Sequence, residues 1–145
     1  MPDPNPHVKV MFRPDHVREP LRPRTAAEFA AVVDSMVADD DFDHSYATVY
    51  FTTSRGDGIL LGLGVFARKR LGAILYQGDA GEFYTRGEQP SGREVFYSDF
   101  GNARFFPPDA EIGADLVKAA LAALWELDGA LPANVRWQQW TDTEH

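Results

Sequence analysis

The clearest helical pattern lies near the start of the chain. Five apolar residues recur at helical spacing after Thr25, and this predicts an amphipathic helix over residues 26–38. These residues are Phe29, Val32, Val33, Met36 and Val37. Thr25 and Glu28 fit a capping box, in which the threonine hydroxyl accepts from a first-turn amide and the glutamate reaches back to the cap. The helix start is therefore well specified.

A second helix is expected after Pro107-Pro108-Asp109, with Asp109 as its N-cap. Its apolar stripe would be formed by Ile112, Leu116, Ala120, Ala123 and Leu127. Gly129 stands where a C′ glycine belongs, and Pro132 prevents the helix from continuing. The length and apolar width of this stripe predict a core helix.

Between the helices the apolar period changes to two. Tyr46, Thr48, Tyr50 and Thr52 alternate with smaller or apolar residues, which is typical of a strand. Further strands are expected at residues 8–12, 59–66, 71–76, 82–85, 95–98, 103–106 and 135–137. This order predicts an α+β domain whose mainly antiparallel, twisted sheet forms a meander, with two principal helices packed on it.

The length of 145 residues suits one domain. Residues 1–24 contain six prolines and read as a proline-rich N-terminal arm with a short edge strand. Residues 25–140 are expected to form the single α+β domain, and residues 141–145 a polar tail. The N-terminus has no secretory signal pattern, and the longest apolar run, Ile59 to Ala67, is too short to span a membrane. We expect a cytoplasmic protein.

The net charge of -8 disfavours direct contact with nucleic acid or anionic lipid, because both are negatively charged. Acidic residues outnumber basic ones 9 to 5 in residues 1–44 and 7 to 2 in residues 109–145, whereas residues 45–108 are nearly neutral. Both flanks are therefore negative, which favours a basic partner. The absence of cysteine excludes disulfides, thiolate metal sites and cysteine nucleophiles.

The densest charge lies in the stretch ADDDFDH, which contains Asp39, Asp40, Asp41, Asp43 and His44. Its Asp-x-Asp-x-Asp spacing resembles the start of a calcium loop, but histidine replaces the required glycine and tyrosine replaces the final glutamate. The four histidines are scattered along the chain, so no metal site is expected. Two interpretations stay open: a solvated helix end, or an acidic patch facing a partner.

Other chemical motifs are weak. Gly62, Gly64 and Ala67 formally satisfy the dinucleotide pattern G-x-G-x-x-A, but they lie inside a strand pattern with no helix following. Glycines in such a place more often mark a bulge or a close packing contact. The sequence has neither a nucleophile elbow nor a zinc-deaminase signature, so we expect no enzyme, no cofactor and no metal.

Two tryptophans lie near the C-terminus, in the stretch VRWQQW. Trp137 alternates with Val135 and should pack under the second helix. Trp140 lies in a polar stretch and is the better candidate for an exposed anchor, because tryptophan is enriched at interface hot spots.

The C-terminal half carries a family resemblance. Tyr97-Ser-Asp-Phe-Gly101, Phe106-Pro107, the alanine-rich helix and LDGALPANVRW together resemble the Imm1 family of immunity proteins from bacterial polymorphic toxin systems. The resemblance also takes in the helix from Thr25 and the hairpin GLGVFARKRLGAILYQG, and it covers roughly residues 22–140. Where the family usually has Thr-Gly, this sequence has Asp128-Gly129.

This resemblance implies a non-enzymatic antitoxin that binds one cognate secreted toxin domain and blocks its active site. Toxins paired with the family are often nucleases or nucleic-acid deaminases with basic clefts, which suits the acidic flanks. Asp39, Asp40, Asp41, Asp43 and Trp140 are then the candidate partner-binding residues. Two other classes stay open: a small-ligand module built on the sheet, and a catalytic domain using Asp41 with His44, the only local pair suited to it.

Overall fold

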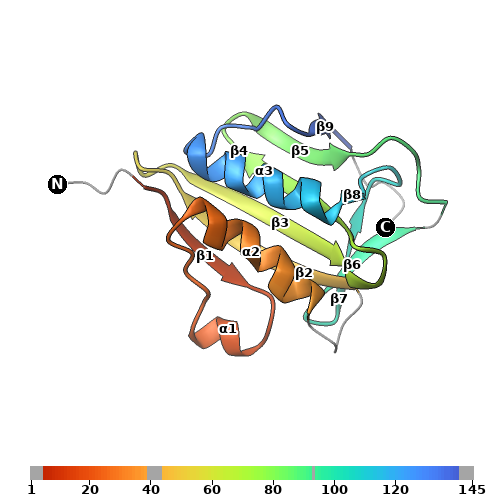
Figure 1. Ribbon diagram of the computed structural model, residues 1–145, viewed down its shortest axis with the longest axis horizontal. Helices are drawn as coiled ribbons and strands as arrows, with labels where there is room; N and C mark the ends of the chain where they lie inside the picture. The colour runs from red at the N-terminus through yellow and green to blue at the C-terminus, as the bar shows by residue number, and fades with distance from the viewer. Residues whose placement is uncertain (1–4, 39–43, 93, 141–145) are drawn as a thin grey trace.

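A computed structural model describes residues 5–38, 44–92 and 94–140 of the chain. The strands are β1 (His7–Met11), β2 (His44–Thr52), β3 (Gly58–Phe66), β4 (Leu71–Gly78), β5 (Gly81–Arg86), β6 (Val95–Asp99), β7 (Asn102–Phe106), β8 (Ile112–Gly113) and β9 (Arg136–Gln138). The helices are α1 (Asp15–Arg18), α2 (Ala26–Val37) and α3 (Ala114–Glu126), and η1 (Ala67–Lys69) is a 3-10 turn. The fold is a strand-rich mixture of helices and strands (Figure 1).

The strands form one curled sheet in the order β7-β6-β2-β3-β4-β5-β9, with β1 also paired to β2 and β8 to β4. Nearly all pairs are antiparallel, and β2 to β5 follow each other as the predicted meander. The exception is the parallel contact between β2 and β6 at Ser45 and Ser98. The mainly antiparallel sheet expected from the two-residue period is confirmed.

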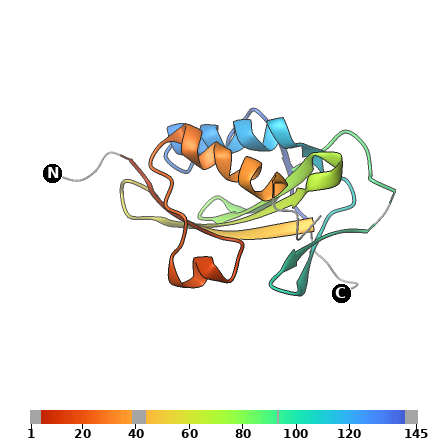
Figure 2. The same ribbon diagram turned by 60° about the horizontal axis from the view of Figure 1, so that its bottom comes forward.

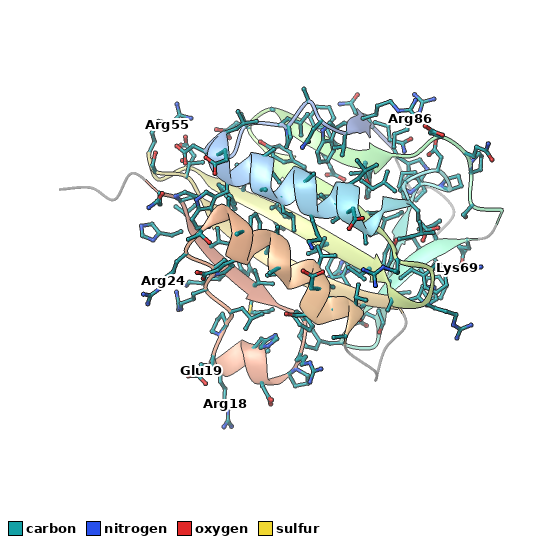
Figure 3. All side chains as sticks on the ribbon, in the orientation of Figure 1. Arg18, Glu19, Arg24, Arg55, Lys69 and Arg86 are labelled. Atoms are coloured by element: carbon teal, nitrogen blue, oxygen red, sulfur yellow. The ribbon has the colours of Figure 1, made fainter. Side chains whose placement is uncertain are left out.

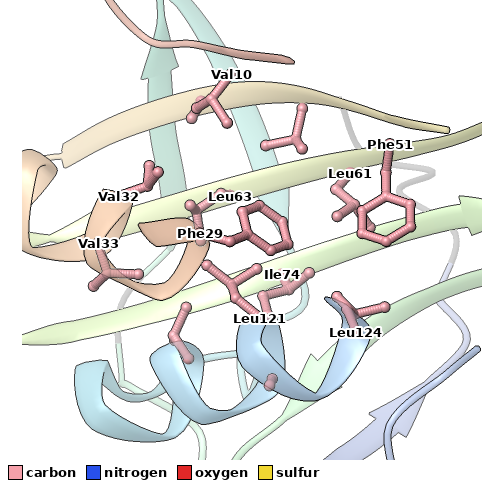
Figure 4. Packing of buried hydrophobic residues seen from close by; sticks show 14 of the residues in the cluster. Val10, Phe29, Val32, Val33, Phe51, Leu61, Leu63, Ile74, Leu121 and Leu124 are labelled. Carbon is pink, nitrogen blue, oxygen red and sulfur yellow. The ribbon is translucent and has the colours of Figure 1, made fainter. Parts of the chain in front are cut away.

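The two longer helices, α2 and α3, lie side by side on one face of the sheet (Figure 2). The alternating residues Ala47, Val49 and Phe51 of β2 are buried in the same hydrophobic cluster as these helices. Phe29 from α2 and Leu121 from α3 are fully buried in it (Figure 4). This core exists because one face of each strand and one stripe of each helix are apolar.

The prediction of two helices is incomplete, because the described residues include a third, α1, of four residues. It follows β1, which pairs with β2 as an edge strand. Val10 of β1 is fully buried, and a backbone bridge joins it to Leu21. The chain therefore leaves β1, makes the short α1 turn and returns to β1. Figure 2 shows α1 on the side of the sheet opposite to α2 and α3.

Helix α2 begins where the sequence predicts. The amide of Glu28 donates to the Thr25 hydroxyl at 3.0 Å, which is the expected N-cap. The Glu28 carboxylate accepts from the amide of Arg24 at 3.1 Å, one residue before the position that a capping box uses. Both bonds satisfy amides at the start of the helix.

Helix α3 begins at Ala114, four residues later than the predicted Asp109 N-cap would place it, and its N-cap is Gly113. The intervening backbone is hydrogen-bonded to the sheet instead. Asp109 accepts from the amide of Gly87, and Ile112–Gly113 form strand β8 against β4. Tertiary pairing thus overrides the local N-cap signal of the Pro-Pro-Asp sequence.

Helix α3 ends in a Schellman arrangement, since the amide of Gly129 donates to Leu124 and that of Asp128 to Trp125. Asp128, with φ of +52°, occupies C′, and Gly129 follows it. The predicted C′ glycine is therefore displaced by one residue. The Asp128 carboxylate accepts from the amide and hydroxyl of Ser54, and these hydrogen bonds hold the pKa of Asp128 below its ordinary value.

Two glycines inside β3, Gly62 and Gly64, are packing positions. A side chain at Gly62 would overlap the phenol of Tyr46, and one at Gly64 would overlap the ring of Tyr97. The close packing contact expected from strand glycines is confirmed. Gly62 and Gly64 lie within a strand, and Ala67 opens the turn η1 into another strand, so the dinucleotide pattern has no helix behind it.

Candidate partner-binding surface

The second face of the sheet is not covered by α2 and α3. One rung of side chains crosses it through paired residues of five strands: Lys9, Tyr50, Leu60, Gln77 and Glu82. Tyr50 is 50% exposed and Leu60 is 38% exposed, although both are large and apolar. This rung is therefore a mixed apolar and polar strip facing solvent.

At one end of the same face the β6–β7 hairpin supplies a second cluster of buried residues. Tyr97 and Phe106 from the hairpin pack with Tyr46 of β2 and Tyr84 of β5. Burial raises the pKa of Tyr46 to about 12, and the nearby Arg104 guanidinium opposes this shift. The hairpin is thus anchored on the sheet by aromatic side chains.

A row of aromatic rings leads from this cluster to the surface. The imidazole of His44 stacks on Phe66 at 4.1 Å between centroids and on Phe96 at 5.7 Å. Phe96 in turn contacts Phe105 across the hairpin at 5.9 Å. Phe96 is 38% exposed, so the row ends in an aromatic patch at the beginning of β2.

The hairpin tip has an unusual residue. Phe100 and Gly101 both have positive φ, +50° and +88°, in a two-residue loop between the paired Asp99 and Asn102. This backbone is that of a type I′ turn, whose first position favours asparagine, aspartate or glycine. Phe100 nevertheless occupies it and is 49% exposed. The neighbouring ion pair between Arg104 and Asp99, at 2.8 Å, braces the hairpin below the tip.

A cavity of about 360 Å³ adjoins the tip. It arises because β1 and β6 pair with different parts of the same edge of β2: β1 with residues 48–52 and β6 at Ser45 (Figure 1). Phe12 and Pro14, which follow β1, line it together with Phe100 and Gly101, and Ser45 and Ser98 complete the lining. The cavity is thus a mainly apolar cleft between two parts of the chain.

A larger and more polar groove of about 900 Å³ follows β1. Its lining includes Tyr50 and Val17 together with three basic side chains, Lys9, Arg22 and Arg24. Charged side chains project outward along this side of the molecule (Figure 3). The groove is wide and open, with a cationic rim in a chain that is acidic as a whole.

Four of the predicted partner-binding residues, Asp39, Asp40, Asp41 and Asp43, lie outside the described residues. The fifth, Trp140, is half-buried. Its ring meets Tyr84 edge-on at 5.5 Å and packs against the second aromatic cluster. The expectation that Trp140 is an exposed tail residue is therefore only partly met, because it has a structural contact.

Trp137 packs against the main core as expected, and its indole nitrogen donates to the Pro132 carbonyl at 2.8 Å. Phe100 and the cleft beside it were not found from the sequence, where residues 99–102 only separate the strands expected at 95–98 and 103–106. The sequence signal for Phe100 was a phenylalanine at a turn position that favours asparagine. No sequence signal marked the cleft, because the cleft depends on how β1 and β6 share one edge of β2.

Residues 5–38, 44–92 and 94–140 contain no group of three or more histidine, aspartate or glutamate side chains placed to hold a metal ion. Within the same ranges no helix is long and apolar enough to cross a membrane. The proposed catalytic pair of Asp41 and His44 falls partly outside the description, since Asp41 does. The described surface does offer exposed aromatic and apolar side chains, among them Tyr50, Phe96 and Phe100.

The family model for immunity protein Imm1 matches residues 18–139, from the end of α1 to the end of the sheet. Among curated proteins, none matches the chain by sequence. The matched region contains α2, α3 and strands β2 to β9, so it includes both the core and the β6–β7 hairpin. The chain belongs to the Imm1 family of immunity proteins.

Proposed function

We propose that the protein is an antitoxin that binds a cognate secreted toxin domain in the cytoplasm and blocks its active site. The observation that carries this proposal is the family match over residues 18–139. Family membership suggests a binding protein without catalysis. The described surface fits that role, because its distinctive features are exposed aromatic and apolar side chains, which are typical of protein interfaces.

The partner we propose is a basic, nucleic-acid-modifying toxin, either a deaminase or a nuclease. Enzymes that act on nucleic acid need positive charge in their substrate cleft to hold phosphates. A chain with net charge -8 is suited to such a cleft. Opposite charges steer association and raise its rate towards about 10⁸ M⁻¹s⁻¹ at low salt, which protects a cell that makes its own toxin.

The acidic run is the proposed source of this steering. Asp39, Asp40, Asp41 and Asp43 bring four carboxylates into five consecutive positions immediately before His44. His44 begins β2 and stacks in the aromatic row with Phe66 and Phe96. The run is therefore joined directly to a described aromatic patch. We propose that long-range attraction from the carboxylates precedes short-range apolar contact.

Co-expression with the product of the gene immediately upstream tests this function. A catalytically inactivated form of that product should co-purify with the protein as a one-to-one complex, measured by light scattering. The active form should lose its deaminase or nuclease activity on a nucleic-acid substrate when the protein is added. The association rate should fall as salt rises. Absence of both binding and inhibition, with the protein folded, would reject the antitoxin function for this pair.

A further inference from the structure

We propose that Phe100, at the tip of the β6–β7 hairpin, and the cleft beside it form the apolar anchor site for the toxin. This inference rests on the proposed function and identifies which part of the surface makes the tight contact. The toxin would place an apolar side chain in the cleft, against Phe12 and Pro14 on one wall and Phe100 on the other.

The first argument is conformational. In a type I′ turn the first central residue has a left-handed backbone, which asparagine and glycine adopt readily and bulky residues adopt at a cost. Phe100 has φ of +50°, and yet about half of its side chain faces solvent. A bulky residue that breaks a local backbone preference while much of its side chain stays exposed is a candidate for function.

The second argument is rigidity. Hot spots bind well when their backbone is held in the bound shape beforehand. Below the tip, Arg104 pairs with Asp99, and the hydroxyl of Ser98 accepts from the amide of Gly101 at 3.3 Å. Tyr97 and Phe106 anchor the two strands of the hairpin in the buried aromatic cluster. Phe100 is therefore an exposed side chain on a fixed support.

The third argument concerns the kind of partner. The cleft and the ring of Phe100 are mainly apolar, and they call for an apolar or aromatic side chain. Two residues of the aromatic row, Phe96 and His44, lie on the same strands as Ser98 and Ser45 of the cleft lining. In the sequence, four carboxylates precede His44 within five positions. A partner with an apolar side chain surrounded by basic residues complements both features. We expect the rim of a phosphate-binding cleft in the toxin to have that character.

The cleft also joins a family element to a segment outside the family match. Ser45, Ser98 and Phe100 lie within residues 18–139, whereas Phe12 and Pro14 precede them. One wall is thus carried by the shared scaffold, and the other belongs to a part of the chain that the family model does not cover. We expect this second wall to contribute to the choice of one toxin over its relatives.

The central test compares Phe100→Asn with Leu116→Ala in binding to the inactivated product of the upstream gene. Asparagine suits the left-handed turn, so the Phe100→Asn variant should unfold at the same temperature or higher while its Kd rises by about tenfold or more. Leu116 on α3 is also 49% exposed, and its truncation should leave the Kd unchanged. Gain in stability with loss of binding is a result that a purely structural role for Phe100 would not produce.

A second variant tests the opposite wall. Pro14→Lys places a positive charge at an exposed position of the cleft, which should repel a basic toxin and weaken binding by about tenfold. If the wild type binds the toxin and Phe100→Asn and Pro14→Lys bind equally well, the anchor site is wrong while the antitoxin function stands. If the wild type itself does not bind, the proposed function fails first.

Light scattering also tests whether a second copy of the chain, rather than the toxin, occupies the cleft. Light scattering should show the isolated protein as a monomer over the concentrations used for binding. A dimer that dissociates in the Phe100→Asn variant would mean that the tip is a self-association surface, and it would overturn the assignment of the cleft to the toxin.

Discussion

The phenol of Tyr46 lies directly over Gly62 of the neighbouring strand, where a methyl group would overlap it. Replacing Gly62 by alanine should therefore force Tyr46 out of the second aromatic cluster. We expect the free energy of unfolding to fall by about 1–3 kcal/mol, the usual effect of overpacking. Chemical denaturation measures this change.

Gly58 provides the matched control for this substitution. It lies at the start of the same strand, and nothing surrounds the position of an added methyl within 4 Å. Gly58→Ala should leave stability unchanged or raise it slightly, because alanine reduces the freedom of the unfolded chain. Equal effects at the two positions would show that Tyr46 does not depend on the glycine.

Thr85 joins β4 to the segment before α3. Its buried hydroxyl donates to the Ala110 carbonyl at 2.9 Å and accepts from the Ile74 amide at 3.1 Å. Thr85→Val keeps the shape but removes the hydroxyl's hydrogen bonds, so we expect a loss of about 1–3 kcal/mol in the free energy of unfolding. Thr85→Ser keeps the hydroxyl and should be less destabilising. A smaller effect of valine than of serine would contradict this role.

Tyr46 should make the fold sensitive to alkali. Burial raises its pKa to about 12 in the folded protein, while the unfolded chain ionises near pH 10. Below about pH 10 the phenol is neutral in both states, so its ionisation does not change the free energy of unfolding. Between pH 10 and 12 only the unfolded chain ionises, and this lowers the free energy of unfolding by about 2–3 kcal/mol at pH 12. The wild type should lose this amount relative to Tyr46→Phe in unfolding measured from pH 8 to 12. Parallel curves for the two proteins would reject the shift.

The acidic run should act on the rate of association. Replacing Asp39, Asp40, Asp41 and Asp43 by asparagine changes the net charge from -8 to -8 + 4 = -4. We expect a lower association rate with the toxin and a weaker dependence of that rate on salt, measured by stopped flow, with little change in dissociation. Unchanged kinetics would remove this hypothesis.

A control for total charge neutralises four other carboxylates, giving the same net charge of -4. Suitable exposed positions are Glu19, Asp79, Glu88 and Glu126. If the acidic run acts by position, this variant should retain more of the wild-type association rate. Equal losses would mean that net charge alone matters.

Trp140 is a second proposed contact, and its packing on Tyr84 has to be separated from binding. Trp140→Ala should lower the survival of cells that express the toxin and weaken the complex by about tenfold. Trp140→Phe retains an aromatic ring for Tyr84, so comparing the melting temperatures of the two variants separates stability from recognition. Full protection by the alanine variant, at wild-type stability, would remove Trp140 from the interface.

The secondary structure followed closely from local patterns where those patterns were strong. Helix α2 starts at its Thr25 cap, and β2 to β5 form the meander because alternating residues bury one face. The start of α3 was predicted too early. The carbonyl of Asp109 accepts a hydrogen bond from the amide of Gly87, and Ile112–Gly113 pair with β4. Such a bond joins residues far apart in sequence, so no local pattern reveals it.

The candidate site, too, was predictable only where local sequence carried the information. Charge, the lack of cysteine and the acidic run are properties of the sequence alone, and together with the resemblance they indicated a binding protein with a basic partner. Trp140 was recognised as a residue type, but its contact with Tyr84 required the curled sheet.

What the sequence by itself determined is therefore the period of each segment, the net charge and the family, because these are written in the order of the residues. Only the tertiary structure decided that β1 and β6 share the edge of β2 and leave a cleft beside Phe100. The physical reason is that strand pairing joins residues more than 30 positions apart, through backbone groups that are the same in every residue.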